Sequence, residues 1–263
     1  MFGNAASYER FMGRWSRLLA SPLLDFANVP ARGRILDVGS GTGVLSFAIA
    51  ERAAGVSVLG IDPSPEYVAY ARSTNPFSGR ADFEVADAEQ LHFPDRAFDA
   101  AVSMLAFNFI PDAKKALLEL RRVTKPGETI SAAVWDYGDG MRMLRIFWDA
   151  VSATHPQAAK IDEKHMLLCH AGELAALWKE CGLENVREQA LEIRTRFDSF
   201  ADYWDPFLLG QGPGGSYVRS LPVAKADALR DEVLRRLALP DVQTPFDLPA
   251  RAWAVRGAVP IRA

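Results

Sequence analysis

The 263-residue chain has only two cysteines, no long apolar run and no surplus of positive charge. Two cysteines are too few for a small domain held together by disulfides. A transmembrane helix needs roughly 20 consecutive apolar residues, and stretches such as 100–106 are far shorter. Lys and Arg number 30 against 33 Asp and Glu, which gives a net charge of −3. Because binding to phosphates needs excess positive charge, nucleic acid is not expected as a partner, and the short apolar runs give no reason to expect a membrane.

The composition is that of a soluble globular protein. Apolar residues make up 49% of the chain and charged residues 24%, whereas a disordered chain has fewer apolar residues and more net charge. The first ten residues are polar and lack the apolar core of a signal peptide. With so few cysteines, the reducing cytoplasm is the expected location.

Strands and helices are predicted to alternate over residues 34–135. Apolar runs indicate strands that are buried on both faces, and amphipathic segments between them indicate helices. Such alternation is typical of a mainly parallel sheet with helices on both faces. The predicted strands are 34–38, 56–61, 81–86, 98–105 and 128–135, and the predicted helices are 44–52, 66–73 and 112–124.

The pattern is less regular on either side of this region. Apolar spacing predicts a helix over 4–27, which Pro22 should divide into two. Residues 198–245 are expected to form a helical insertion before the last strand, and no linker separates two domains. The remaining elements are predicted as helices at 141–151 and 173–181 and strands at 186–197 and 251–256.

A glycine-rich turn follows the first predicted strand, in the segment Asp37-Val-Gly39-Ser-Gly41-Thr-Gly43. Parallel sheets bind ligands beyond the carboxyl ends of their strands. Glycines let the backbone approach a ligand closely, and the following helix directs N–H groups at it. The turn is therefore the first candidate binding site.

Two classes of ligand compete for this turn. A dinucleotide site has the pattern G-x-G-x-x-G, but the last position is Val44 counted from Gly39 and Ser46 counted from Gly41. The carboxylate of Asp37 suits a cationic or amino-bearing ligand better than a pyrophosphate.

Ile35-Leu-Asp-Val-Gly-Ser-Gly-Thr-Gly43 resembles the first motif of class I S-adenosylmethionine-dependent methyltransferases. The resemblance continues at Asp62, where that family holds the ribose hydroxyls, and at Asp87 and Ala88, where it holds the adenine. Further matching segments are 98–104 and 121–127, so the resemblance covers residues 33–135. Within the family, the chain is most similar to the methyltransferases of ubiquinone and menaquinone biosynthesis. It implies a Rossmann-like α/β sheet, mainly parallel with an antiparallel last strand, helices on both faces and a helical lid.

The resemblance also implies a single methyltransferase domain over 1–263. Within it, 1–29 would form a helical cover, 30–136 the cofactor-binding core and 137–263 the substrate half. Asn108, Tyr137 and Trp148 are candidates for contact with substrate, although Asn108 has a rival role in bonding its own loop. The implied cofactor-binding residues are Tyr8, Trp15, Asp37, Gly39, Ser40, Gly41, Gly43, Asp62, Pro63, Asp87, Ala88 and Met104.

The activity that the resemblance implies is transfer of a methyl group from S-adenosylmethionine to a small molecule. An in-line displacement depends on alignment and exclusion of water more than on acids and bases. No residue stands out as a general base, so the catalytic residue stays unassigned. The alternatives are a nicotinamide-dependent oxidoreductase and a non-catalytic protein that binds the same cofactor. The substrate, the methylated atom and the oligomeric state are left open.

Three further features are expected to be structural. His165 and Cys169 would share one face of a helix, but a zinc site needs four ligands and Cys181 is too distant, so no metal is expected. The segment Gly210–Gly215 lacks the G-K-[ST] ending of a phosphate loop and is predicted to be a flexible loop. Four aromatic residues of the lid either exclude water from the site or form the core of the lid. They are Trp148, Trp204, Phe207 and Tyr217.

Overall fold

The computed structural model describes residues 8–261 and divides into two compact units. Unit 1 comprises Met1–Arg14, Trp135–Met166 and Glu192–Arg251. Unit 2 comprises Trp15–Val134, Leu167–Leu191 and Ala252–Ala263. The predicted organisation into cover, core and substrate half remains a prediction, and residues 1–7 of its cover lie outside the described part of the chain.

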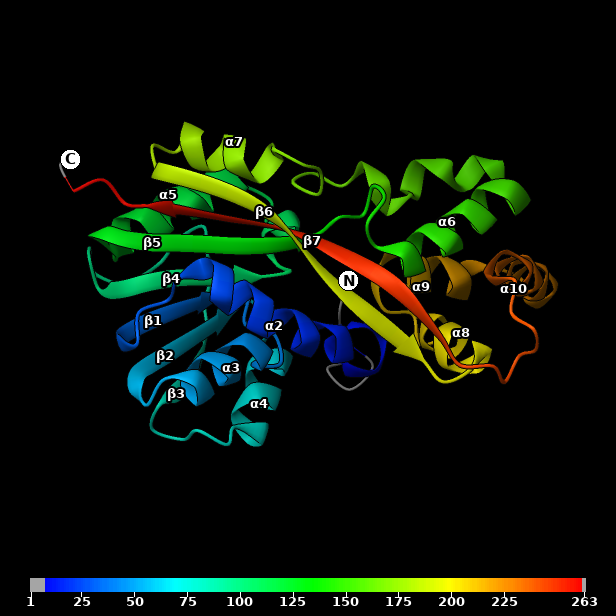
Figure 1. The fold of residues 1–263 in the computed structure, drawn as a ribbon, viewed down its shortest axis with the longest axis horizontal. Helices are drawn as coiled ribbons and strands as arrows, with labels where there is room; N and C mark the ends of the chain where they lie inside the picture. The colour runs from blue at the N-terminus through cyan, green and yellow to red at the C-terminus, as the bar shows by residue number, and fades with distance from the viewer. Residues whose placement is uncertain (1–7, 262–263) are drawn as a thin grey trace. The chain divides into compact units, whose positions relative to one another are not determined.

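The strands form one seven-stranded sheet in the order β3-β2-β1-β4-β5-β7-β6 (Figure 1). Pairing is parallel from β3 across to β5, which confirms the mainly parallel sheet. The register aligns Val38 of β1 with Ile61 of β2. The strands are β1 (Arg32–Val38), β2 (Gly55–Asp62), β3 (Ala81–Val85), β4 (Phe98–Met104), β5 (Thr124–Trp135), β6 (Glu184–Phe197) and β7 (Phe246–Ala258).

The last strand runs against its neighbour β5, as predicted. The N–H of Gly127 donates to the carbonyl of Val259 at 2.8 Å, and the N–H of Asp136 donates to the carbonyl of Arg251 at 2.9 Å. Residue numbers therefore rise along β5 as they fall along β7, which is the antiparallel arrangement.

Helices cover both faces of the sheet in unit 2 (Figure 1). On one face, Leu117 and Leu120 of α5 and Trp178 of α7 join a buried cluster with Leu36 of β1. The Trp178 indole N–H also donates to the carbonyl of Ile130 at 3.1 Å. The helices are α2 (Arg14–Ala27), α3 (Val44–Arg52), α4 (Pro65–Thr74), η2 (Phe107–Phe109), α5 (Ala113–Val123) and α7 (Glu173–Glu180).

Unit 1 is built around an aromatic core. The rings of Phe147 and Phe207 stack with their centroids 4.4 Å apart, and the Tyr203 hydroxyl donates to the carbonyl of Met143 at 2.7 Å. Its helices are η1 (Glu9–Gly13), α6 (Arg142–Thr154), η3 (Pro156–Ile161), η4 (Glu163–His165), α8 (Phe200–Leu208), α9 (Gly212–Ser220) and α10 (Val223–Leu237).

Three local predictions were wrong: those for Pro22, for the pair His165 and Cys169, and for the segment Gly210–Gly215. Pro22 does not divide its helix, because α2 continues through it. Proline has no N–H, so Pro22 cannot donate the helical hydrogen bond to the carbonyl of Leu18, four residues earlier. The Leu18 side chain is 48% exposed, so the missing bond is on a face of the helix that water reaches. His165 and Cys169 do not share a helix, because η4 ends at His165. Both cysteines are buried thiols.

The segment Gly210–Gly215 is not a loop throughout, because α9 begins at Gly212. Pro213 at the start of this helix supplies a backbone angle that suits the first turn. A Cβ on Gly214 would lie only 3.2 Å from the rings of Phe147 and Phe207. The small residues thus let the helix approach the aromatic core. Among the described residues, no helix is long and apolar enough to cross a membrane.

Candidate cofactor and substrate site

The glycine-rich loop joins β1 to α3 and is fastened to the neighbouring strand. The N–H groups of Gly39 and Ser40 both donate to the carbonyl of Ile61, at 2.8 and 2.9 Å. Gly39, Gly41 and Gly43 all have positive φ, at 70°, 52° and 90°, which residues with a side chain rarely adopt. The loop conformation therefore favours glycine at all three positions.

The surroundings of these glycines differ. A Cβ on Gly39 would lie 2.2 Å from the Cβ of Ala106, and one on Gly43 would lie 2.7 Å from the ring of Phe47. A Cβ on Gly41 would meet nothing within 4 Å. Gly39 and Gly43 are thus packed against the protein, whereas Gly41 borders open space that a ligand can fill.

Asp37 lies at the end of β1 and is completely buried. Its Oδ2 accepts a hydrogen bond of 2.7 Å from the Ser46 hydroxyl, but its Oδ1 has no partner within residues 8–261. Burial raises the pKa of Asp37 to about 7, and hydrogen bonds from the Ser46 side chain and backbone oppose that rise. The Ser40 hydroxyl is a second buried group that bonds to none of the described residues.

Asp62, the last residue of β2, holds two backbone segments together. Its Oδ2 accepts from the N–H of Gly41 at 3.0 Å, and its Oδ1 accepts from the N–H of Ser64 at 2.9 Å. Ser64 itself caps α4 by accepting from the N–H of Tyr67. Burial raises the pKa of the Asp62 carboxyl. Each carboxylate oxygen accepts up to two hydrogen bonds, so both retain room for a ligand hydroxyl.

The loop after β3 carries two more predicted residues. Asp87 is exposed, and its Oδ1 accepts from the N–H of Glu89 at 2.9 Å. Ala88 is partly buried against the core of unit 2. Pro63, after β2, is exposed. These residues follow neighbouring parallel strands, so they lie along the same carboxyl edge of the sheet as the glycine-rich loop.

The end of β4 contributes a strained turn. Met104 ends the strand and is buried, and Leu105 then adopts a positive φ of 63°. Such strain in a non-glycine residue is concentrated at functional sites. The turn brings Ala106 against Gly39 and leads to Asn108, whose Nδ2 is buried without a partner in the described chain.

The other predicted residues are divided between the units. Trp15 is in α2 of unit 2 and is 4% exposed. Tyr8, Tyr137 and Trp148 belong to unit 1. Tyr8 is half-buried just before η1, and Tyr137 is 5% exposed. All four assignments remain predictions.

Trp148 is fully buried, and its surroundings contain charge. Its indole N–H donates to Oε2 of Glu163 at 2.7 Å, and burial raises the pKa of Glu163 to about 7. The neighbouring acid, Asp162, forms a buried ion pair with Arg145. Of the predicted lid aromatics, Trp148, Trp204 and Phe207 lie in the core of unit 1, and Tyr217 is half-buried.

Sequence reasoning did not assign roles to three residues of the site, namely Ser46, Leu105 and Ala106. Ser46 was considered only as a poor match to a dinucleotide pattern, although it is the third residue of the helix that follows the glycines. A hydroxyl there can reach an acid at the preceding strand end. The close approach of Ala106 to Gly39 has no counterpart in local sequence.

Residues 36–132 match the family model described as a methyltransferase domain. The fold over these residues agrees with the match, because it is an α/β sheet with the glycine-rich loop at the carboxyl end of β1. Residues 36–132 are therefore similar to a methyltransferase domain in both sequence and fold.

Similar proteins include a demethylmenaquinone methyltransferase from Thermus thermophilus. It is 43% identical over 115 residues, which cover 43% of this chain and 50% of that protein. The chain thus spans about half the length of the curated relatives it matches.

Two solved structures share the fold at low identity. Phosphoethanolamine N-methyltransferase 2 from Haemonchus contortus, in complex with phosphomonomethylethanolamine and S-adenosylhomocysteine, gives a TM-score of 0.60 at 16% identity, covering 97% of this chain and 57% of that one. The [4+2]-cyclase SpnF gives a TM-score of 0.58 at 22% identity, with coverages of 93% and 82%. Because one neighbour is named a cyclase, the fold alone does not fix the reaction.

Proposed function

We propose that this protein binds S-adenosylmethionine and transfers its methyl group to a small-molecule acceptor. The observation that carries the proposal is a group of buried polar atoms without partners among residues 8–261, on and beside the glycine-rich loop: Asp37 Oδ1, Ser40 Oγ and Asn108 Nδ2. Buried polar groups are almost always hydrogen-bonded, so a set of unpaired ones at the ligand edge of a parallel sheet indicates a polar ligand.

The residues present suit this cofactor. Its ammonium and sulfonium groups carry positive charge, which the buried carboxylate of Asp37 would stabilise. Asp62 retains acceptor capacity on both oxygens for the two ribose hydroxyls, and the open space at Gly41 would accommodate the ligand. Asp87 would accept from the adenine amine and Ala88 would offer its N–H. We keep Pro63, Met104, Tyr8 and Trp15 as further proposed contacts.

The bound cofactor would supply an electrophilic methyl group, and the chain would position the acceptor and exclude water. The unpaired Asn108 Nδ2 can donate to an oxygen or nitrogen of the acceptor. Tyr137 and Trp148 remain proposed substrate contacts. Relatives named for methylation of demethylmenaquinone support a quinol or phenol as acceptor. From composition, we further propose a cytoplasmic location and no nucleic-acid or membrane partner.

The competing functions are less well supported. A nicotinamide-dependent oxidoreductase is disfavoured by Val44 and Ser46 in the glycine pattern and by relatives that are named methyltransferases. A measurement of turnover distinguishes an enzyme from a protein that only binds the cofactor. Incubation with methyl-labelled S-adenosylmethionine and a panel of quinols, phenols and amines should label one acceptor class. Binding of the cofactor without transfer to any acceptor would favour the non-catalytic alternative.

Gly41→Ala is expected to weaken binding of S-adenosylhomocysteine at least tenfold, because the added methyl group occupies the open space assigned to the ligand. The positive φ of Gly41 also costs about 1 kcal/mol of folding free energy for alanine. Gly79→Ala is the matched control, since Gly79 has a φ of 83° and likewise no atom within 4 Å of the added Cβ. Calorimetry should show normal affinity for Gly79→Ala, and equal affinities of both variants would refute the assignment.

A further inference from the structure

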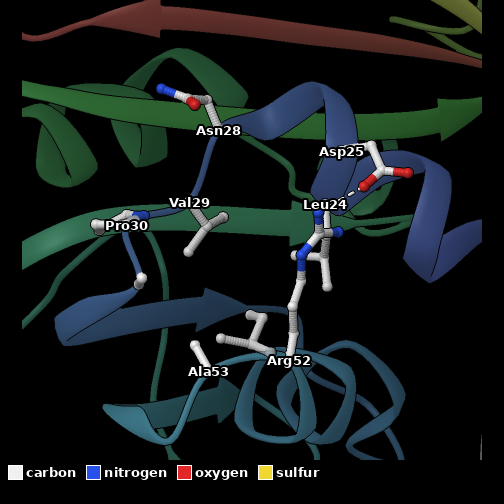
Figure 2. A pocket seen from close by; sticks show the side chains of 9 residues that line it. Leu24, Asp25, Asn28, Val29, Pro30, Arg52 and Ala53 are labelled. Carbon is white, nitrogen blue, oxygen red and sulfur yellow. Dashed lines mark hydrogen bonds and ion pairs between the residues drawn. The ribbon is translucent and has the colours of Figure 1, made fainter.

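A pocket lies at the opposite end of β1 from the glycine-rich loop. Its volume is about 210 Å³, and it is formed by the ends of α2 and α3 and by the turn before β1 (Figure 2). No residue of the proposed cofactor site lines it. The lining residues are Leu24, Asp25, Asn28, Val29, Pro30, Ala31, Ile49, Arg52 and Ala53.

The lining of the pocket is mixed, with an apolar floor beside polar and charged side chains. Leu24 and Ile49 are 5% and 2% exposed, so their side chains belong to the interior. Val29, Pro30 and Ala53 continue this apolar surface. An apolar cavity of about 150 Å³ is large enough to bind benzene. The space here is therefore sufficient for a compact apolar group of phenyl size.

An ion pair between Arg52 and Asp25 borders the apolar floor of the pocket. Arg52 extends from α3 toward Asp25 of α2 (Figure 2), and their side chains meet at 2.6 Å. The two side chains are 51% and 64% exposed, and exposed ion pairs contribute little to stability. Exchanging this pair for contacts with a charged ligand therefore costs the fold little.

The ion pair is not needed to complete the helix ends. Arg256 donates to the carbonyl of Phe26 at 2.9 Å, and Arg80 donates to the carbonyl of Ala50 at 2.6 Å. Asp25 lies in the last turn of α2, which contains no basic residue. A carboxylate at a helix carboxyl end is unfavourable without a cation beside it, so Asp25 depends on its Arg52 partner, and the ammonium of a ligand can take that place.

We propose that this pocket binds a small zwitterion with a compact apolar body, such as an α-amino acid with an apolar side chain. Its carboxylate would pair with Arg52, its ammonium with Asp25, and its side chain with Leu24 and Ile49. A simple carboxylate would leave Asp25 unpaired beside the ligand, and a simple amine would leave Arg52 unpaired. Only a zwitterion uses both charges.

L-Phenylalanine is the probe, and saturating S-adenosylhomocysteine is present so that an amino-acid subsite at the glycine-rich loop is blocked. Amide resonances of Asn28, Ala31 and Ala53 should shift saturably in ¹⁵N–¹H spectra. 3-Phenylpropionate lacks the ammonium and phenethylamine lacks the carboxylate, so each should bind at least tenfold more weakly. Absence of saturable shifts at millimolar probe, shifts centred on 39–43, or equal affinity for 3-phenylpropionate would overturn the proposal.

Three variants test the assigned contacts. Arg52→Gln and Asp25→Asn should each reduce the affinity for L-phenylalanine about tenfold, and Ala53→Leu should abolish binding by filling the pocket. Lys114→Gln is the matched control, because Lys114 forms an equally short, similarly exposed ion pair with Glu180 at 2.6 Å. All four should bind S-adenosylhomocysteine normally. Undiminished affinity for L-phenylalanine in Arg52→Gln would contradict the proposal.

Discussion

Asp62→Ala is expected to weaken binding of S-adenosylhomocysteine by at least about 30-fold, or roughly 2 kcal/mol. Two losses contribute to this effect. The ribose hydroxyls lose a charged acceptor. The N–H groups of Gly41 and Ser64, which both donate to Asp62 in the unmodified protein, lose their shared acceptor. The loop and the start of α4 are then no longer held in the conformation that receives the ligand. Isothermal titration calorimetry measures the change directly.

Asp99→Ala controls for a general loss of stability. Asp99 is also a carboxylate of unit 2 that accepts from a backbone N–H, that of Arg34 at 2.9 Å. It lies against the beginning of β1, whereas Asp62 serves the loop after its end. Asp99→Ala should lower the melting temperature but leave affinity unchanged. A similar affinity for Asp62→Ala and the unmodified protein would refute the role of Asp62 in ribose binding.

Asp37→Asn is expected to stabilise the ligand-free protein while weakening its affinity for the cofactor. The folded-state pKa of Asp37 is raised from 3.8 to about 7 by burial. The folded state therefore holds its proton more tightly than the unfolded state, and stability falls as pH rises from about 4 to about 7. Above that range the ionised carboxylate costs about 4 kcal/mol. Asparagine removes this cost and still accepts from the Ser46 hydroxyl.

Urea unfolding at about pH 8 should show Asp37→Asn more stable by a few kcal/mol, with a smaller gain near pH 5 where Asp37 is protonated. The affinity of the unmodified protein for S-adenosylmethionine should fall below pH 7 as the carboxylate loses its charge, and that of Asp37→Asn should be low and flat. Ser46→Ala should move the midpoint of the affinity profile to higher pH, because it removes a hydrogen bond to the ionised form. Equal stability of Asp37→Asn and the unmodified protein at both pH values would contradict this interpretation.

Local sequence predicted the cofactor half of the fold closely. The predicted helix over 44–52 has the same bounds as α3, and the predicted strand over 98–105 differs from β4 by one residue. These elements are well marked because the strands are buried on both faces and the turns between them contain glycine, proline and aspartate. The mainly parallel topology of the sheet could also be predicted, because alternating strands and helices have few allowed connections.

The interactions that complete the site were not predictable in the same way. The bond between Ser46 and Asp37 joins residues nine positions apart, and the contact between Ala106 and Gly39 joins two separate loops. Both depend on the sheet having already brought its strand ends together. The positive φ of Leu105 is set by that packing and not by residue type.

The second half of the chain was less predictable because its stabilising contacts are long-range and polar. Nothing in the local sequence marks Asp162 and Glu163 as buried, yet Arg145 holds Asp162 and the Trp148 indole holds Glu163 in the interior of unit 1. Prolines and glycines were also misleading there, since α9 begins among them to meet the aromatic core.

The central claim is that the glycine-rich loop holds S-adenosylmethionine, and competitive calorimetry with S-adenosylhomocysteine and NADH tests it most directly. The structure predicts saturable, one-to-one binding of S-adenosylhomocysteine that NADH does not displace and that Asp62→Ala severely weakens. Binding of NADH with no binding of S-adenosylhomocysteine would contradict the proposed cofactor and with it the proposed reaction.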